Sequence, residues 1–202
     1  MKVGIMGGSF NPIHMGHLMM SEYVRDELGL DEVLFVPTGN PPHKALRDVP
    51  DEERLQMVRL SIDDNPHFTI SDIEIRNPHI TYSVDTLGLL HEAYPQGTQF
   101  YFLLGSDIIL DLKKWKKFDE LAALTDFVVT LRPGFEKITM EEIETEARLL
   151  GEQFGAKVTI LHAPRYEISS TDLRSRLREK KSVKYLIPDS VIDYIEEMEL
   201  YR

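Results

Sequence analysis

Short apolar runs alternate with segments of helical periodicity along the chain, and this alternation limits the possible folds more than any other feature. Apolar runs that end at glycine, proline or polar residues are typical of buried strands. A repeat of strand then helix, with strands that are apolar throughout, indicates a parallel sheet covered on both faces. We therefore expect an α/β protein built on a Rossmann-like, doubly wound parallel sheet with right-handed crossovers.

The pattern predicts six strands, at residues 3–6, 33–37, 68–75, 100–105, 126–131 and 157–163. It predicts helices at residues 17–28, 51–62, 82–93 and 140–154, a short helix that ends at 121–124, and two final helices that begin at Thr171 and Asp189. In such a sheet, ligands bind beyond the carboxyl ends of the strands. The loops to inspect therefore follow Met6, Val36, Leu104, Leu131 and Ala163.

The length suits one domain over residues 1–202. We expect a Rossmann-like core at residues 1–163 and a small C-terminal helical part at residues 164–202. Residues 136–155 carry no recognisable motif and are expected to form a peripheral helix.

The composition argues against several classes of protein. The chain has no cysteine, which excludes disulfide scaffolds and thiolate metal sites. Its formal net charge of -11 argues against broad nucleic-acid binding, which needs extended basic surfaces. No apolar run approaches the roughly 20 residues of a membrane span, and the first residues lack the apolar core of a signal peptide. We expect a cytoplasmic protein with no membrane or nucleic-acid partner.

The loop after the first expected strand has the most unusual composition, reading GGSFNPIHMGH from Gly7 to His17. Two adjacent glycines after a strand let the backbone turn tightly or approach a ligand closely. The stretch is not G-x-G-x-x-G, and no carboxylate follows the second strand to bind a ribose, so a dinucleotide-dependent redox fold is not supported. The chain also contains no G-x-x-x-x-G-K-[ST], so P-loop chemistry is not supported either.

His14 and His17 stand three residues apart at the start of the next expected helix. Residues with this spacing share a helix face, and the N–H groups of a helix N-terminus favour an anion. Imidazoles placed there can donate to phosphoryl oxygens. Spacing alone leaves open that the two histidines only cap the helix. A zinc site would need further ligands, which the spacing does not suggest, so we expect no protein-bound metal.

With these residues in place, the chain resembles the nucleotidyltransferases that carry an (H/T)-x-G-H motif, here His14 to His17. Within them it resembles the bacterial nicotinate-mononucleotide adenylyltransferases. Further stretches match that family in order, and together they span residues 1 to about 190. These stretches are PPHK (41–44), LLGSD (103–107), KKW (113–115), TLRPG (130–134) and ISSTDLR (168–174).

The resemblance implies an ATP site in which Arg174 clamps the phosphates and Asp107 meets the adenosine ribose. The implied ATP-binding residues are Gly7, Gly8, Ser9, Phe10, His14, His17, Gly105, Asp107, Ser169, Ser170, Thr171 and Arg174. The implied catalytic residues are His14, His17, Lys44 and Arg174. Helix capping remains an alternative for one hydroxyl of ISSTDLR and for Ser106 or Asp107.

The resemblance also implies a nicotinate-mononucleotide site in which Trp115 stacks on the pyridine ring and the backbone amide of Thr86 meets the carboxylate. The implied residues are Asn11, His43, Lys44, Thr86, Trp115 and Arg132. A solvated side chain remains an alternative for Lys44, and a surface role for Arg132. Many relatives have a tyrosine after the tryptophan where this chain has Lys116, so the stacking expectation rests on Trp115 alone.

The implied reaction joins ATP and nicotinate mononucleotide to give nicotinate adenine dinucleotide and pyrophosphate, a step of NAD biosynthesis. No covalent nucleophile is suggested by the sequence, so direct in-line displacement is the simplest route. Mg²⁺ is expected to be held by the phosphates and water, and the protein to be a possible homo-oligomer. Alternatives are an adenylyltransferase for nicotinamide mononucleotide or phosphopantetheine, and a nucleotide-sensing domain without catalysis.

Overall fold

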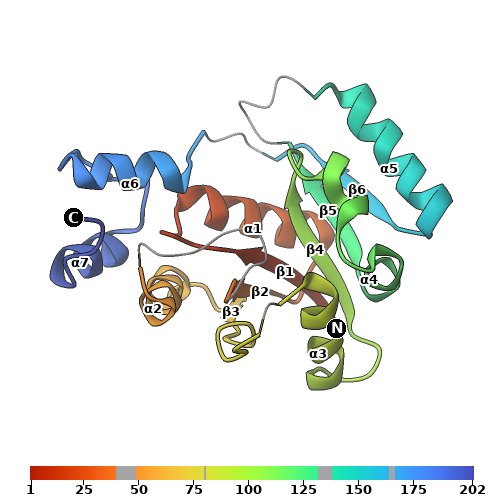
Figure 1. Ribbon diagram of the computed structural model, residues 1–202, viewed down its shortest axis with the longest axis horizontal. Helices are drawn as coiled ribbons and strands as arrows, with labels where there is room; N and C mark the ends of the chain where they lie inside the picture. The colour runs from red at the N-terminus through yellow and green to blue at the C-terminus, as the bar shows by residue number, and fades with distance from the viewer. Residues whose placement is uncertain (40–48, 80, 132–137, 164–166) are drawn as a thin grey trace. The chain divides into compact units, whose positions relative to one another are not determined.

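A computed structural model describes residues 1–39, 49–79, 81–131, 138–163 and 167–202 (Figure 1). The strands form one six-stranded sheet in the order β3-β2-β1-β4-β5-β6. They are β1 (Lys2–Gly8), β2 (Glu32–Pro37), β3 (Phe68–Ile70), β4 (Gln99–Gly105), β5 (Asp126–Thr130) and β6 (Val158–Leu161). The pairings β1–β4, β4–β5 and β5–β6 are all parallel. The expected α/β, Rossmann-like fold is therefore confirmed.

Helices connect most of the strands, as parallel pairing requires. They are α1 (Met15–Leu28), α2 (Asp51–Ile62), α3 (Ser83–Ala93), the 3₁₀ helix η1 (Ile109–Lys114), α4 (Phe118–Leu124), α5 (Met140–Phe154), α6 (Ser170–Arg178) and α7 (Asp189–Glu197). Helix α1 ends as its sequence predicts: Gly29 adopts a positive φ of 57°, and the Leu30 amide donates back to the Arg25 carbonyl. Every helix in the described ranges is too short or too polar to span a bilayer.

The chain forms two compact units, each built from three stretches of sequence. The first unit comprises Met1–Met6, Met20–Val33 and Tyr82–Glu167. The second unit comprises Gly7–Met19, Leu34–Thr81 and Ile168–Arg202. The motif loop and the ISSTDLR segment both belong to the second unit.

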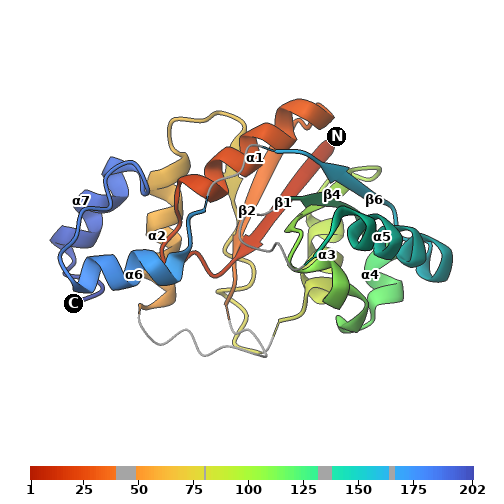
Figure 2. The same ribbon diagram turned by 90° about the horizontal axis from the view of Figure 1, so that it is seen from above.

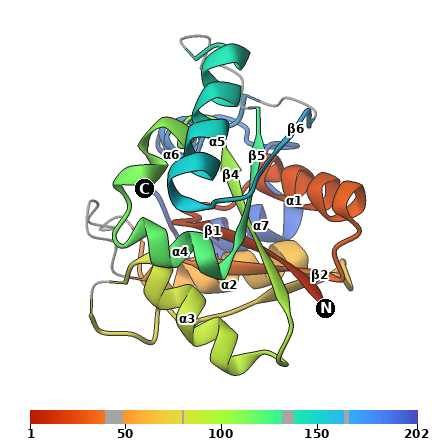
Figure 3. The ribbon, with the colours of Figure 1, turned by 90° about the vertical axis from the view of Figure 1, so that its right-hand side faces the viewer.

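In the first unit, β1 and β4 pair from Lys2 opposite Gln99 to Ile5 opposite Phe102. Helix α5 packs on β6 and η1, and α3 packs on α4 (Figure 3). The expected peripheral helix at 136–155 is α5, whose N-terminus has a capping box formed by Thr139 and Glu142. The core of this unit combines apolar strand residues, such as Phe102 and Val128, with apolar helix residues, such as Leu87 and Leu150.

In the second unit, α2 packs against β3 and against α7, and Figure 2 shows α2 and α7 as neighbours. The Ser190 hydroxyl of α7 donates to the Leu60 carbonyl of α2, and the Tyr194 hydroxyl donates to the Glu53 carboxylate. These two hydrogen bonds attach α7, near the C-terminal end of the sequence, to α2, which follows β2.

Most element boundaries agree with the prediction within two residues, and two of the differences have a visible cause. Strand β1 runs through Gly7 and Gly8 instead of ending before them, and the Thr38 amide donates to the Gly8 carbonyl at 2.9 Å. Strand β3 ends at Ile70, although alternation predicted a strand to residue 75. The Ile73 amide turns back onto the Ser71 hydroxyl there, and such local bonds compete with a strand ladder.

Gly39 lies where two backbone segments approach closely. A Cβ atom at this position would stand 2.1 Å from the Glu74 carbonyl oxygen, so alanine requires a backbone shift. We expect Gly39→Ala to lower the free energy of unfolding by about 1–3 kcal/mol, measured by urea denaturation. Gly88, inside α3, is the matched control because a Cβ there meets nothing within 4 Å.

Gly88→Ala is expected to raise the free energy of unfolding by roughly 0.5–1 kcal/mol, because alanine is the better helix former. The opposite signs of the two glycine substitutions are the expected result. A Gly39→Ala protein as stable as the wild type would contradict the steric argument.

Candidate functional site

The two motif histidines lie against each other at the N-terminus of α1. Their rings stack with centroids 3.7 Å apart and an interplanar angle of 27°. His14 immediately precedes the helix, and its carbonyl accepts from the amides of His17 and Leu18. Its side chain is buried at 4% exposure, whereas His17 is half-buried. His17 is therefore the more accessible imidazole of the pair.

A backbone bond fixes which nitrogen of His17 can donate. The His14 amide donates to Nδ1 of His17 at 3.3 Å. In a neutral imidazole one ring nitrogen accepts and the other carries the hydrogen, so the hydrogen of His17 is on Nε2. The His17 side chain therefore caps the N-terminus of α1, as the spacing had left open. Capping uses Nδ1 and phosphate binding would use Nε2, so the two roles are compatible.

Gly16 and Phe10 shape the surroundings of the histidines. A Cβ at Gly16 would stand 3.1 Å from Nδ1 of His14 and 3.8 Å from Cβ of Ile168. The Phe10 ring meets the His17 ring edge-on, with centroids 5.1 Å apart. The glycine between the histidines therefore lets the rings lie close to the helix and to the segment that precedes α6.

The three hydroxyls of ISSTDLR have three different roles. Ser169 is the N-cap of α6 and accepts from the Asp172 amide at 3.2 Å. Ser170 donates to the Pro12 carbonyl at 3.0 Å, and Thr171 accepts from Nη2 of Arg174 at 3.3 Å. The capping alternative is correct for Ser169, whereas the Ser170 hydroxyl ties the start of α6 to the motif loop and the Thr171 hydroxyl holds Arg174 within the same helix.

Arg174 connects the two motifs directly. Its Nη1 donates to the Asn11 carbonyl at 2.8 Å, across 163 positions of sequence. Together with the Ser170 bond, this places the N-termini of α1 and α6 side by side within the second unit. That proximity is the geometry which a shared anion site requires.

A fully buried arginine that sequence analysis missed holds the motif loop from another direction. Arg54 of α2 has 0% exposure, and it donates to the Ser9 and Thr38 carbonyls at 2.6 Å each and to Asp51 at 2.7 Å. Its cationic head therefore stabilises the loops after β1 and β2. No sequence signal marked it, because DEERLQM reads as an ordinary solvated start of a helix.

In the first unit, Gly105 is the last residue of β4 and Asp107 follows in the turn. The Ser106 amide donates to the Thr130 carbonyl at 2.9 Å, which continues the ladder to β5. Helix η1 begins after Ile108, so neither Ser106 nor Asp107 is its N-cap residue. The capping alternative is therefore wrong for this pair.

Thr86 and Trp115 also belong to the first unit. The Thr86 amide donates to the Tyr82 carbonyl at 3.1 Å in the first turn of α3, so the backbone donor expected to meet a carboxylate already has an intrahelical acceptor. Trp115 ends η1 half-buried, and its ring meets Phe102 edge-on with centroids 5.8 Å apart. One face of the indole thus remains a candidate for stacking.

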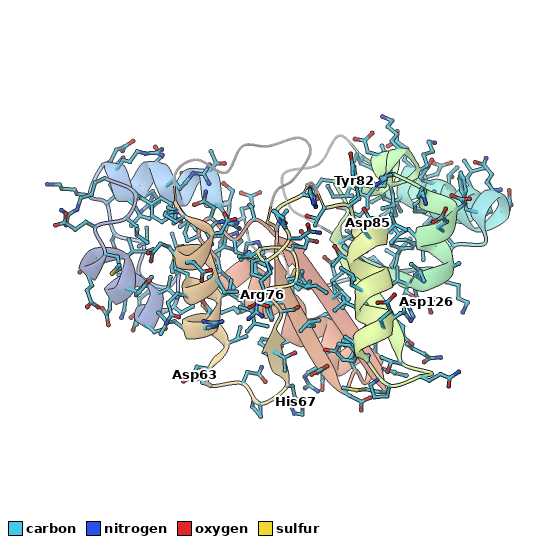
Figure 4. All side chains as sticks on the ribbon, turned by 60° about the horizontal axis from the view of Figure 1, so that its bottom comes forward. Asp63, His67, Arg76, Tyr82, Asp85 and Asp126 are labelled. Atoms are coloured by element: carbon cyan, nitrogen blue, oxygen red, sulfur yellow. The ribbon has the colours of Figure 1, made fainter. Side chains whose placement is uncertain are left out.

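Lys116, which follows the expected stacking residue Trp115, lies over the N-terminus of α3. Its Nζ is 4.0 Å from the centroid of the Tyr82 ring and 3.3 Å from a carboxylate oxygen of Asp85. Figure 4 shows Tyr82 and Asp85 at the same end of that helix. Lys116 is thus held by a cation–π contact and an exposed ion pair.

Three expected site residues, His43, Lys44 and Arg132, lie outside the described residues. Among the residues that are described, no group of three histidine, aspartate or glutamate side chains is arranged to hold a metal ion.

Comparison with known proteins identifies the class to which this fold and these motifs belong. The sequence model of the cytidylyltransferase-like family matches residues 5–176, which is most of the chain. The protein therefore belongs to the cytidylyltransferase-like family.

The relatives narrow that class. The chain is 43% identical over its whole length to a Thermoanaerobacter sp. protein, covering 95% of it, and 41% identical to one from Desulfitobacterium hafniense, covering 96% of it. Both are named "Probable nicotinate-nucleotide adenylyltransferase". Within its class, the chain groups with the nicotinate-nucleotide adenylyltransferases, as the motifs predicted.

Solved structures agree with this grouping. The nicotinic acid mononucleotide adenylyltransferase of Plasmodium falciparum, complexed with NaAD, matches with a TM-score of 0.80 and 26% identity. The match covers 99% of this chain and 97% of that one. The same Plasmodium enzyme complexed with APC matches with a TM-score of 0.77 and 25% identity.

Proposed function

We propose that this protein is an enzyme that joins ATP and nicotinate mononucleotide to give nicotinate adenine dinucleotide and pyrophosphate. The observation that carries the proposal is the junction of the two motif helices in the second unit, where the donor of His17 and the guanidinium of Arg174 flank one loop. Family membership supports the same chemistry. We also propose that the whole chain, residues 1–202, is one nucleotidyltransferase domain.

The proposed reaction is a direct displacement at the α-phosphorus of ATP. A phosphate oxygen of nicotinate mononucleotide forms a bond to that phosphorus, and the bond to the bridging oxygen breaks. Its electron pair leaves with pyrophosphate, so no covalent enzyme intermediate is needed. Such transfers depend mainly on positioning and on neutralising charge, which donors held in place by the fold can supply.

His17 is proposed to donate from Nε2 to a non-bridging phosphoryl oxygen, with His14 orienting it through the bond to Nδ1. Arg174 is proposed to clamp the departing phosphates while it holds the Asn11 carbonyl. Because the N-termini of α1 and α6 lie side by side, the dipoles of both helices favour an anion there. Lys44, by resemblance, would add a further positive charge.

The remaining substrate contacts are proposed from the family resemblance. Asp107 and Gly105 would bind the adenosine ribose, and Gly7, Gly8, Ser9 and Phe10 would line the phosphate path. Asn11, His43, Trp115 and Arg132 would bind the mononucleotide, with the half-buried indole against the pyridine ring. The Thr86 amide would take part by sharing its hydrogen between the Tyr82 carbonyl and the substrate carboxylate.

Mg²⁺ is proposed to accompany ATP, held by phosphate oxygens and water, as this ion usually is. It would supply charge neutralisation on the triphosphate. Because ATP is the proposed donor, we expect the protein to act in the cytoplasm, and assembly into a homo-oligomer is compatible with this chemistry.

The experiment that tests the proposed function compares two mononucleotides with ATP, measuring pyrophosphate release and dinucleotide formation. We expect kcat/KM for nicotinate mononucleotide to exceed that for the amide by about 10–100-fold. A hydrogen bond to a charged carboxylate contributes about 1.5–3 kcal/mol, and the amide cannot replace that charge.

Reactions without a mononucleotide control for simple ATP hydrolysis. A ratio near one would contradict the proposed substrate, and pyrophosphate release that does not depend on any mononucleotide would contradict the proposed reaction.

A further inference from the structure

The hydroxyl of Tyr201 reaches a residue of the motif loop 190 positions earlier in the chain. It donates to Oδ1 of Asn11 at 2.6 Å, in a bond that is buried. Asn11 is 3% exposed and Tyr201 is 5% exposed. A buried hydrogen bond between two side chains that distant in sequence needs a specific tertiary arrangement. No sequence motif marked Tyr201.

The same short stretch of the loop is held by three groups from the last part of the second unit. Tyr201 holds the Asn11 side chain, Arg174 holds the Asn11 carbonyl, and Ser170 holds the Pro12 carbonyl. Two of these groups belong to the proposed phosphate clamp. Tyr201 belongs to no motif, and it is the one of the three that acts on a side chain of the loop.

The backbone that presents Tyr201 is strained. Tyr201 has a φ of 63° and Glu199 a φ of 55°, so two non-glycine residues within three positions adopt left-handed conformations. Each such residue costs about 1–2 kcal/mol. The turn is stabilised by bonds from the Met198 amide to the Tyr194 carbonyl and from the Leu200 amide to the Ile195 carbonyl. The left-handed Glu199 belongs to a common type of helix end, so Tyr201 is the residue whose left-handed backbone that end does not explain. The placement of the Tyr201 ring and hydroxyl is what this strain supports.

The bond determines how the Asn11 amide is oriented. Because Oδ1 accepts from Tyr201, the Nδ2 end of the amide, with its two N–H donors, faces the opposite direction. A flipped or freely rotating amide would present an oxygen where a donor is needed. Tyr201 therefore controls which polar group Asn11 can offer to a ligand.

We propose that Tyr201 is a positioning residue for the reaction, which aims the Nδ2 donors of Asn11 at an acceptor oxygen of the phosphorylated mononucleotide. The proposal rests on the proposed function, and it adds a residue that acts through another. It predicts an effect on the mononucleotide and not on ATP.

The test is Tyr201→Phe, which removes the hydroxyl and leaves the ring to fill its buried position. We expect KM for nicotinate mononucleotide to rise about tenfold, while KM for ATP changes less than twofold. Unfolding in urea corrects for any loss of folded protein. Calorimetric titration with the mononucleotide alone should show the same tenfold weakening without any turnover.

A double-mutant cycle establishes whether Tyr201 acts through Asn11. If it does, adding Tyr201→Phe to Asn11→Ala leaves KM where Asn11→Ala alone puts it. Additive effects of the two substitutions would overturn the proposal, and so would an unchanged mononucleotide KM in a folded Tyr201→Phe protein.

Tyr194→Phe is the matched control, because this tyrosine also belongs to the last part of the chain but donates to Glu53 of α2. Burial, and then the Glu53 carboxylate, raise the pKa of Tyr194 to about 12, so its hydroxyl is a donor at neutral pH. Its loss should lower the melting temperature and leave both KM values unchanged.

The outcome also separates this inference from the proposed function. If the wild type binds the mononucleotide but forms no dinucleotide, and Tyr201→Phe weakens that binding, then the positioning role stands and the reaction is wrong. If the wild type forms dinucleotide and Tyr201→Phe matches it in both KM values, then the reaction stands and the positioning role is wrong.

Discussion

Replacing His17 with alanine is expected to lower kcat by about 10²–10³-fold, measured as pyrophosphate release at saturating ATP and nicotinate mononucleotide. Removal of one donor that stabilises developing charge in a transition state has an effect of this size. The Nδ1 atom of His17 is already occupied by the His14 amide, so Nε2 is the nitrogen that can donate to a phosphoryl oxygen. KM values should change less than kcat, because the bond is strongest in the transition state.

His17→Asn separates catalysis from capping. The asparagine side-chain oxygen can still accept from the His14 amide, which His17 does through Nδ1, but the shorter asparagine Nδ2 does not reach the position of Nε2. The asparagine variant should therefore unfold like the wild type in urea and still lose turnover.

His67→Ala is the matched control, because this exposed histidine of the second unit lies on the turn before β3 (Figure 4). It should keep wild-type kcat. Near-normal turnover in folded His17→Ala protein would refute the proposed mechanism.

Replacing Arg174 with alanine is expected to lower kcat/KM for ATP by about 10²-fold. The guanidinium would lose a charge-assisted bond to phosphate, worth about 1.5–3 kcal/mol, and the Asn11 carbonyl would lose its partner. Both losses affect the same loop, so the effect should lie near the upper end of the range for a single phosphate contact. Steady-state kinetics with ATP as the varied substrate measures it.

Arg174→Lys retains the charge and should recover only part of the activity. An ammonium group cannot hold the Asn11 carbonyl and present a planar fork to phosphate at the same time. Arg176→Ala on the same helix is the control, since that side chain donates to the Ser182 carbonyl and not to the loop. If Arg176→Ala lowered kcat/KM for ATP as much as Arg174→Ala does, the loss would reflect the removal of any positive charge from α6. The proposed phosphate clamp would then be wrong.

The fold followed from the sequence because buried strands and helix stops leave strong local signals. The run FYFLLG became the central strand β4, and Gly29 ended α1 as predicted. Strand β3 was predicted too long because its alternation continues to residue 75, while a local bond at Ser71 turns the chain earlier. The Ser71 hydroxyl takes the Ile73 amide away from the strand ladder, and a pattern of apolar residues contains no information about such a bond.

The motif residues of the candidate site could be named from sequence, but what holds them could not. Arg54 and Tyr201 sit in stretches that read as ordinary helix and tail, and their importance comes only from contacts across 45 and 190 positions. Sequence motifs also could not show that Ser169 caps α6 while Ser170 and Thr171 bind elsewhere. Adjacent hydroxyls look alike until the helix start is fixed.

The separation in sequence between the motif loop and its partners has a consequence for synthesis. Asn11 and Pro12 are bonded by residues 158, 163 and 190 positions later. At about 5–20 residues per second, a ribosome adds Tyr201 roughly 10–40 s after Asn11. The strands and helices made first can assemble during translation. All three hydrogen bonds to the loop, however, can form only once residue 201 has emerged from the ribosome.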